Sequence, residues 1–334
     1  MEITTILVSW KDEPELLEAI GALAAARARL PASGASASLV VVDNGGGGGG
    51  KVSAQAVQKL WPGAALLVNA ENRGYGPAAN QAAAKATGDI LFFLNPDTRV
   101  EGDPFSALAR AFAADPRAVA LAPRLVEMDG SAPPAGPLVL APPGAEDQAT
   151  FQLRRLPSLG RDATELLLVD HAFPNHRGRR HSRYADEDRE KSFPVEQAAA
   201  AALAVRTDVF RRLGGFDERY VPAWYEDVDL CARLGREGSI VYLPEARVRH
   251  RGGDSAARLG YAKFLPAFYR NALRYRGAHY GLPARAAYRL LLAKGMALRF
   301  LLLPFRRRVP RTRSEAAAAY ARVFLLALGL YRDA

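Results

Sequence analysis

LFFLNPDT, residues 91–98, is an apolar run that ends abruptly in polar and turn-forming residues. Gly88 and Asp89 bound the run on one side and Pro96 on the other, which predicts a buried strand rather than a helix. In open α/β sheets, ligands bind beyond the carboxyl ends of the strands. Asp97 is therefore a candidate ligand for a cation held against a phosphate. The alternative is that Asn-Pro-Asp is only a turn.

The sequence around this run alternates strand and helix patterns over its first 125 residues. Strands are predicted at Thr4–Val8, Leu39–Val42, Ala65–Val68, Ile90–Leu94 and Val119–Ala122, and later at Ser239–Leu243. Helices are predicted at Pro14–Arg29, Val52–Leu60, Gly76–Ala86 and Pro104–Ala114, and later at Glu226–Gly235. This alternation predicts an α/β fold with a mostly parallel, doubly wound sheet flanked by helices.

Two irregular segments interrupt the pattern, because residues 130–144 are rich in Pro, Ala and Gly and residues 177–191 are dense in charge. We expect a mobile insertion at about 130–191. Beyond residue 258 the pattern is helical throughout. The predicted division is an α/β domain at 1–257 and a helical C-terminal appendage at 258–334.

The bulk composition narrows the class of protein. The chain has 334 residues, of which 49% are hydrophobic and 24% charged, as expected for a folded globular protein. The net charge of +10 favours anionic partners, but aromatic residues do not alternate regularly with the basic clusters, so nucleic acid is not predicted. A single cysteine, Cys231, excludes an internal disulfide and a cysteine-built zinc site, and fits the cytoplasm. The N-terminus is interpreted as a strand, not a signal peptide.

A second acidic site lies downstream, where Glu226 and Asp227 open a predicted helix. Trp224 and Tyr225 precede the pair, and Gly214–Gly215 allow a tight turn before them. Aromatic neighbours can partly desolvate a carboxylate and raise its pKa toward useful base strength. The alternative is that the two carboxylates only complement the helix dipole.

Two glycine-containing stretches add candidate ligand-binding residues. His250 follows a strand-like segment in VRHRGGDS, where Gly252 and Gly253 would let the backbone approach a ligand. The tract Gly45–Gly50, followed by Lys51, nearly forms a phosphate-binding P-loop, but Val52 replaces the metal-binding Ser or Thr. A flexible turn explains the tract more simply.

The order of these motifs resembles the family 2 glycosyltransferases with a GT-A fold, especially their rhamnosyltransferase-like members. The matching segments are ILVSW (6–10), VVVDN (40–44), NRGYGPAANQAAAKATGDILFFLNPDT (72–98), GGFDERYVPAWYEDVDLCARL (214–234) and HRGGDS (250–255). They cover roughly residues 3 to 255 in the expected order.

The resemblance implies a nucleotide-sugar site and a metal site. Asp43 would read the base, and the backbone around Val8 and Ser9 would line the same pocket. Further nucleotide-sugar contacts are implied for Asn72, Arg73, Gly74, Asn80 and Asn95. Asp97 stands in the metal-binding triplet and would hold Mg²⁺ or Mn²⁺ on the diphosphate, with His250 as a second ligand.

The resemblance also implies the catalytic residues. Glu226 and Asp227 match the acidic pair of the family, with Asp227 as the general base, and we expect Trp224 and Tyr225 to contact the acceptor. Three departures bear on this match. Asn95 replaces the first carboxylate of the triplet, glycines follow Asn44, and Gln197–Ala202 contains no glycine in the acceptor region.

The implied function is an inverting, metal-dependent glycosyltransferase. Its donor would be a dTDP- or UDP-sugar, with rhamnose as the leading sugar, and its acceptor a hydroxyl of a growing cell-surface glycan or lipid-linked molecule. The alternative is a catalytically silent nucleotide-sugar or glycan binding protein, which the Asn95 and glycine departures would suit. A P-loop NTPase is a third hypothesis.

Residues 285–308 combine large apolar side chains with frequent Arg and Lys. Their uncharged stretches are far shorter than the ~20 residues of a spanning helix. Such a helix could lie in the headgroup interface, with Arg306–Arg308 on anionic lipid at the inner face of the cell membrane. Equally, it could pack on the catalytic domain or across a homodimer.

Overall fold

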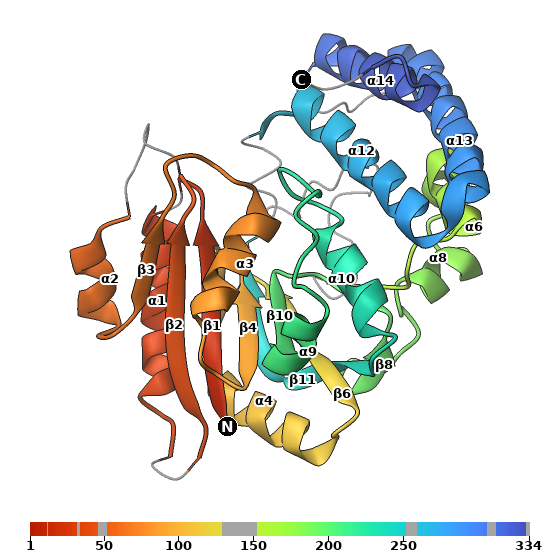
Figure 1. Ribbon diagram of the computed structural model, residues 1–334. Coiled ribbons are helices and arrows are strands. Elements are labelled where there is room, and N and C mark those ends of the chain that lie inside the picture. Colours follow the sequence, from red (N-terminus) through yellow and green to blue (C-terminus); the bar gives the residue numbers. More distant parts are fainter. Residues whose placement is uncertain are drawn as a thin grey trace. The chain divides into compact units, whose positions relative to one another are not determined.

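The computed structural model describes residues 1–11, 13–31, 34–45, 52–128, 152–251, 259–305 and 312–331. The chain divides into two compact units (Figure 1). The described residues up to 128, with 152–155 and 187–251, belong to the first unit, and those in 156–186 and from 259 onward belong to the second.

The first unit is built on a mixed sheet of nine strands in the order β3-β2-β1-β4-β10-β6-β11-β5, with β8 paired to β11. The strands are β1 (Glu2–Ser9), β2 (Ser36–Asp43), β3 (Ala65–Val68), β4 (Ile90–Leu94), β5 (Thr98–Val100), β6 (Ala118–Glu127), β8 (Phe193–Val195), β10 (Ala202–Arg206) and β11 (Ser239–His250). Strands β3, β2, β1 and β4 pair in parallel, while β10 is antiparallel to both β4 and β6. A separate two-stranded sheet joins β7 (Leu153–Arg154) to β9 (Gln197–Ala198).

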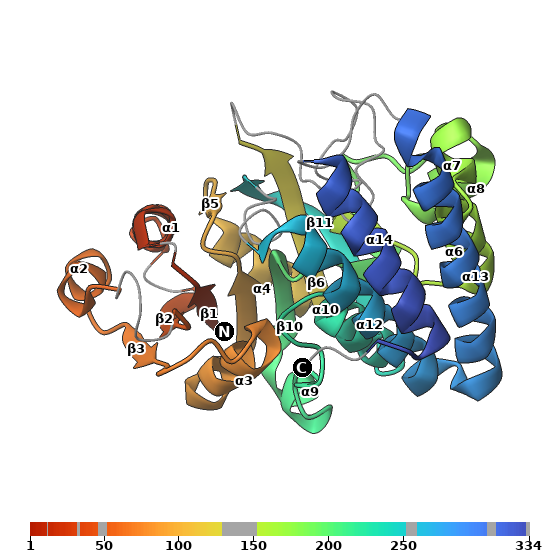
Figure 2. The same cartoon turned by 90° about the horizontal axis from the view of Figure 1, so that it is seen from above.

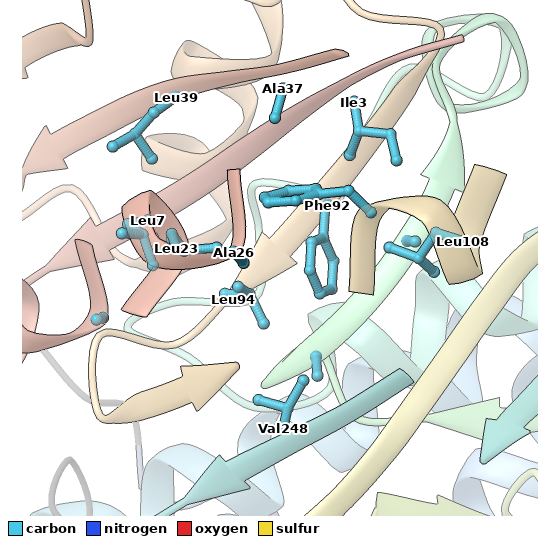
Figure 3. Close-up of a cluster of buried hydrophobic side chains, with 14 of the residues drawn as sticks. Ile3, Leu7, Leu23, Ala26, Ala37, Leu39, Phe92, Leu94, Leu108 and Val248 are labelled. Carbon is cyan, nitrogen blue, oxygen red and sulfur yellow. The ribbon is translucent and has the colours of Figure 1, made fainter. Parts of the chain in front are cut away.

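Helices cover both faces of this sheet, as Figure 2 shows from above. The helices of this unit are α1 (Glu13–Arg27), α2 (Ala54–Leu60), α3 (Tyr75–Lys85), α4 (Pro104–Ala114), α9 (Thr207–Arg212) and α10 (Glu226–Leu234). Side chains of α1, α2 and α4 share one core with the sheet, and Figure 3 shows part of it around Phe92. The next residue, Phe93, points to the other face and packs on Phe210 and Phe216, at ring centroid distances of 5.1 Å each.

The whole of β4 is buried, which explains its unbroken apolar sequence. A central strand with helices on both faces has no side that meets water, so alternation disappears. The predicted α/β fold is confirmed, and the bounds Ile90–Leu94 and Pro104–Ala114 agree with the prediction.

One predicted strand is longer than expected. The sequence places its end at Leu243, before Pro244, whereas β11 continues to His250. The register against β6 shifts between Leu243 and Arg247, and this irregularity accommodates the proline, which has no N–H to donate to a regular ladder. The extension carries His250 to the site described below.

The second unit is helical. It contains α6 (Leu159–Leu166), α7 (Val169–Ala172), α8 (Arg177–Ser182), α12 (Tyr261–His279), α13 (Gly281–Leu302), the short 3₁₀ helix η1 (Leu303–Phe305) and α14 (Arg313–Leu328). Residues 156–186, which the sequence analysis assigned to an insertion in the α/β domain, therefore form helices of this second unit. Of the rest of the predicted insertion, residues 152–155 and 187–191 belong to the first unit, and residues 130–151 lie outside the described residues, as does Lys51 with most of the glycine tract.

Candidate active site

Polar residues gather where β1, β2 and β4 end. The parallel register places Ser9 beside Asp43 and Leu7 beside Leu94, so the carboxyl ends of the three strands share one edge. Asn95 and Asp97 follow β4 directly at this edge. The edge is where open α/β sheets bind ligands.

Asn44 organises the loops that meet at this edge. Its Nδ2 donates to Asn72 Oδ1 at 2.9 Å and to the Gly74 carbonyl at 3.1 Å. Its Oδ1 accepts from Asn69 Nδ2 at 2.9 Å and from the Arg73 N–H at 3.1 Å. The motif at 72–74 is therefore held against the end of β2 by one buried amide.

Asp43 is buried and spans the ends of the glycine-rich loop. One carboxylate oxygen accepts the Gly45 N–H and the other accepts the Val52 N–H, each at 3.0 Å. A carboxylate offers about four lone-pair sites, so two such bonds leave acceptor capacity. Reading of a base by Asp43 stays a prediction.

The structure brings Asp97 and His250 together. Strand β5 pairs with β11 so that His250 lies opposite Thr98, the neighbour of Asp97 in the chain. His250 Nε2 lies 3.4 Å from Asp97 Oδ1, and the Arg251 N–H donates to the Asp97 carbonyl at 3.1 Å. Both side chains are buried.

This pair fits the predicted divalent cation site. Within the part of the chain that the structure describes, no cluster of three His, Cys, Asp or Glu side chains suits a metal. Mg²⁺ is usually bound through one or two carboxylates, together with substrate phosphates and water. Asp97 supplies one carboxylate, which matches that requirement, and His250 would add a nitrogen donor beside it.

A short alanine segment links this edge to the acidic pair. The Asn95 N–H donates to the Ala201 carbonyl at 3.1 Å, and the Ala200 N–H donates to Asp227 Oδ2 at 3.3 Å. Residues 198–202 are buried. Alanine side chains are small enough for backbone groups to reach neighbours on both sides, so the absence of glycine here does not prevent close approach.

The two carboxylates of the pair have different surroundings. The Val228 N–H donates to Asp227 Oδ1 at 2.8 Å, so both oxygens of Asp227 accept backbone N–H groups. Burial raises the pKa of Asp227, and these backbone donors, with Arg154, oppose the increase. Burial and then the charge of Asp227 raise the pKa of Glu226 well above its ordinary value. Asp227 is therefore the member that keeps its negative charge more readily.

The first turn of helix α3 packs against the same acidic pair. A Cβ added to Gly76 would lie 3.9 Å from the Cβ of Glu226, which places this turn of α3 against the acidic pair. The pKa of Tyr75 is raised by burial and then by the charges of Glu226 and Asp227. The Tyr75 ring also packs edge-on against Phe216, at a centroid distance of 5.7 Å.

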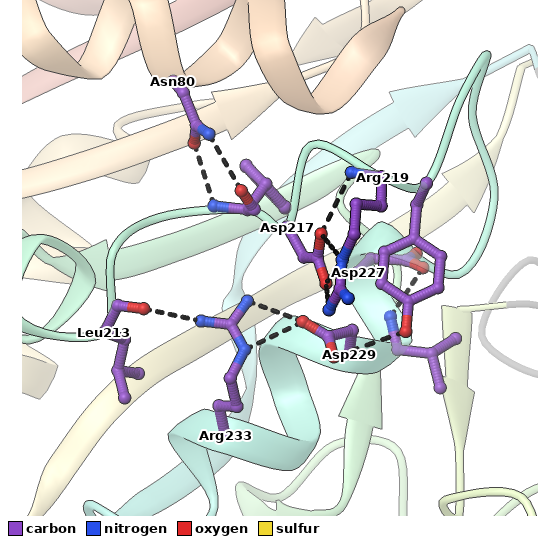
Figure 4. Close-up of polar contacts among 10 residues, drawn as sticks. Asn80, Leu213, Asp217, Arg219, Asp227, Asp229 and Arg233 are labelled. Carbon is purple, nitrogen blue, oxygen red and sulfur yellow. Dashed lines mark hydrogen bonds and ion pairs between the residues drawn. The ribbon is translucent and has the colours of Figure 1, made fainter. Parts of the chain in front are cut away.

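The segment between α9 and α10 carries Trp224 and Tyr225, and polar contacts fix its conformation (Figure 4). Asn80 Nδ2 donates to the Phe216 carbonyl and the Phe216 N–H donates to Asn80 Oδ1, each at 2.8 Å. Buried Asp229 accepts from Arg233, which also donates to the Leu213 carbonyl at 3.1 Å. Asn80 thus positions this segment, and a direct nucleotide contact by Asn80 is not needed to explain its place in the motif.

Trp224 and Tyr225 adopt an unusual backbone. Their φ angles are +71° and +76°, in the left-handed region that side chains other than glycine rarely occupy. Such a conformation costs about 1–3 kcal/mol per residue and is found most often at functional sites. The strain lies immediately before Glu226.

Most of the predicted residues therefore come together at one edge of the first unit. Val8 and Ser9 are buried at the end of β1, while Asn72 and Arg73 are exposed. The sequence analysis missed Asn44 as the organiser, although a polar residue directly after the second strand was a usable signal. Tyr75 and Ala200 carried no signal, because their contacts with the acidic pair arise only in the folded chain.

Comparison with known proteins identifies the family to which this chain belongs. The model of glycosyl transferase family 2 matches residues 4–162. A protein named N-acetylglucosaminyl-diphospho-decaprenol L-rhamnosyltransferase, from two strains of Mycobacterium tuberculosis, is 30% identical over 263 residues, which cover 75% of this chain and 78% of the relative.

Solved structures share the fold at low sequence identity. The structure of GalNAc-T7 with UDP, GalNAc and Mn²⁺ has a TM-score of 0.53 at 14% identity, over 98% of this chain and 56% of that one. The mannosyltransferase PcManGT from Pyrobaculum calidifontis, with GDP-Man and Mn²⁺, also has a TM-score of 0.53, at 16% identity over 99% of this chain and 81% of that one. The motifs, the topology and these similarities agree, and the chain belongs to glycosyl transferase family 2, as a rhamnosyltransferase-like member with the GT-A fold.

Proposed function

We propose that this glycosyltransferase moves rhamnose, with inversion, from a dTDP- or UDP-sugar to a hydroxyl of a lipid-linked acceptor in cell-surface glycan synthesis. The mycobacterial relative supports both the sugar and the kind of acceptor through its name. The buried free Cys231 is compatible with action in a reducing compartment, the cytoplasm, at the inner face of the membrane.

The observation that carries the proposal is the contact of consecutive alanines with both halves of the site. The Ala201 carbonyl accepts a hydrogen bond from the N–H of Asn95, which begins the Asn-Pro-Asp triplet. The Ala200 N–H donates to the carboxylate of Asp227. A group that binds diphosphate and a group that accepts a proton must act on opposite faces of one sugar. Because Asn95 and Asp227 are hydrogen-bonded to neighbouring alanines, the diphosphate-binding group and the proton acceptor would stay at a constant distance from each other.

Asp227 is the proposed general base. Its carboxylate would take the proton from the acceptor hydroxyl as that oxygen attacks the anomeric carbon opposite the diphosphate. The backbone N–H groups of Ala200 and Val228 would hold the carboxylate in one orientation, and burial would increase its basicity. Trp224 and Tyr225 would shape the acceptor side.

On the donor side, Asn44 would hold the 72–74 loop, from which Arg73 can reach a phosphate. The buried end of β1 at Val8 and Ser9, and the carboxylate of Asp43, would line the base pocket. Asp97 and His250 would hold Mg²⁺ or Mn²⁺, which when bound neutralises charge on the diphosphate.

The test is release of nucleoside diphosphate from a panel of nucleotide sugars, with Mn²⁺ or with EDTA, in the presence of a lipid-linked acceptor. We expect metal-dependent release from one donor. Asp227→Asn should lower turnover about 100- to 10,000-fold while donor binding persists, because only proton transfer is lost. Asp97→Ala should weaken metal-dependent donor binding.

Asp208→Asn is the matched control, because Asp208 is exposed on α9 and pairs only at the surface with Arg212. Its turnover should equal that of the native chain. Full turnover by Asp227→Asn would show that Asp227 is not the general base. Release of nucleoside diphosphate that persists in EDTA would show that no metal is required. Binding of a donor with no release to any acceptor would favour the silent binding protein.

A further inference from the structure

The outward faces of α13, η1 and α14 are unusually apolar. On α13 and η1, Leu282, Leu301 and Phe305 are 75%, 70% and 82% exposed, respectively. Leu290 and Phe300 are exposed on the same helix, and Leu325 and Leu328 on α14. Single exposed hydrophobic residues are ordinary, but a group that recurs along two adjacent helices is not.

Helical spacing collects these residues on one side of each helix. Leu282, Leu290 and Leu301 fall within one sector of α13, roughly opposite the buried face formed by Tyr288, Leu292 and Met296. On α14, the exposed residues Ala318, Ala321, Leu325 and Leu328 form a stripe opposite buried Ala319, Tyr320 and Val323. Each helix therefore has one apolar side in the bundle and a second one facing out.

The two helices lie side by side. Arg289 Nη1 on α13 donates to the carbonyl of Ala327 on α14 at 3.2 Å, and the two helices make extensive contact along their lengths. This contact joins the Leu290 region of α13 to the Leu328 end of α14. The exposed sides of α13, η1 and α14 are called the α13–α14 apolar face below.

The charged residues of this part of the chain are almost all basic. Glu315 is the only acidic residue between Leu259 and Tyr331, a stretch that contains fourteen Lys or Arg. Lys294 is exposed between Leu290 and Leu301 on the apolar side of α13, and Arg313 is exposed at the start of α14. A partner for this face must accept apolar side chains and neutralise cations together.

We propose that the α13–α14 apolar face docks on the surface of an anionic phospholipid bilayer. Helices with apolar side chains on one face and flanking Lys or Arg lie in the plane of the interface, where the cations meet anionic headgroups. None of the helices in the described ranges is long and apolar enough to span a membrane. α13 has sufficient length, with 22 residues, but Arg285, Arg289, Lys294 and Arg299 interrupt it.

A second copy of the chain fits this face less well. A twofold dimer would bring the same patch from both copies together. Lys294 would then face a partner that offers almost no acidic residue in the corresponding region, so the charges would repel each other. Anionic lipid supplies the missing negative charge.

The test is cosedimentation of the full chain with vesicles of phosphatidylcholine alone and with vesicles that also contain phosphatidylglycerol. We expect binding to the anionic vesicles that weakens with salt. The triple variant Leu290→Gln, Leu301→Gln, Phe305→Gln should bind at least about tenfold more weakly, because each side chain loses its apolar insertion. Lys294→Glu should weaken anionic binding about fivefold or more.

Val68→Gln is the matched control, because Val68 is 61% exposed in β3 and lies outside this face. It should bind vesicles as the native chain does, and circular dichroism should show that all variants fold. Equal binding by the triple variant, or no binding of the native chain to anionic vesicles, would overturn the proposal. A dimer in light scattering that the triple variant loses, without vesicle binding, would instead assign the face to self-association. Vesicle binding requires neither donor nor turnover, so this result is independent of the proposed transfer reaction.

Discussion

At the scale of single residues, the proposed chemistry depends on the surroundings of Glu226, which is buried, and of Asp227, which is partly buried. Asp227 receives two backbone N–H groups, while the Oε2 of Glu226 has no hydrogen-bond partner among the described residues. Two neighbouring carboxylates in such a place do not both ionise easily. We infer that Glu226 holds a proton over a wider pH range than Asp227.

This inference gives a pH-dependent prediction for Glu226→Gln. Burial and the charge of Asp227 raise the pKa of Glu226 in the folded state, so the native chain binds more protons than the unfolded chain between the ordinary and the raised pKa. The free energy of unfolding therefore falls as pH rises through that window. Each unit of pKa elevation corresponds to about 1.4 kcal/mol.

Gln cannot ionise, so Glu226→Gln should be more stable than the native chain at neutral pH and should lose this advantage below the ordinary carboxyl pKa. Urea denaturation across a pH series measures the difference. Glu237→Gln, which changes an exposed carboxylate, is the control. A stability difference that does not change with pH would contradict the assignment.

At the scale of elements, the segment between α9 and α10 must hold its shape for α10 to present the acidic pair. Gly214 and Gly215 both have positive φ, at +77° and +74°. A Cβ at Gly214 would meet no atom within 4 Å, whereas a Cβ at Gly215 would collide with Oδ1 of Asn80. Substitution of Gly214 therefore tests backbone strain alone, whereas substitution of Gly215 tests backbone strain together with a steric clash.

Gly214→Ala should cost only the left-handed backbone penalty of about 1–2 kcal/mol. Gly215→Ala should cost more, because it also disrupts the bonds between Asn80 and Phe216. Turnover of Gly215→Ala should fall as the acidic pair shifts, since small displacements of catalytic groups reduce rates strongly. Chemical denaturation and donor turnover measure both effects, and equal behaviour of the two variants would show that Asn80 does not position this segment.

At the scale of the whole molecule, each compact unit has its own buried interior. In the second unit, the guanidinium of Arg276 pairs with Asp162 and lies over the rings of Tyr275, Tyr280 and Tyr288. Burial raises the pKa of Asp162 despite the charge of Arg276. Removing one partner would leave an uncompensated buried charge, which costs about 3–5 kcal/mol.

Arg276→Ala should therefore destabilise the second unit by about 3–5 kcal/mol, while the nucleotide affinity proposed for the first unit is retained. Differential scanning calorimetry and donor titration below the transition measure the two quantities. Arg276→Ala combined with Asp162→Ala should recover part of the loss, because it removes both charges. A single Arg276→Ala variant as stable as the native chain would show that the pair contributes nothing.

Predictability differs between the local elements and their long-range contacts. The bounds of β4 and α4 follow from apolar runs and from Pro104 at a helix start, which are local signals. The helices at 156–186 were missed, because charge density at 177–191 suggested an irregular segment. α8 nevertheless forms within that segment, with Arg180 and Asp186 pairing at its surface.

The sequence by itself determined the α/β class, the order of the motifs and the candidates Asp97, Asp227 and His250, because strand ends, turns and charged residues leave local patterns. Asp43 became a candidate only through the family resemblance. The tertiary structure alone decided which of them meet. The pairing of β5 with β11 brings His250 to Asp97 across more than a hundred residues, and Ala200–Ala201 connect Asn95 with Asp227. Such contacts depend on strand register and burial, which are properties of the folded chain and leave no periodic mark in the sequence.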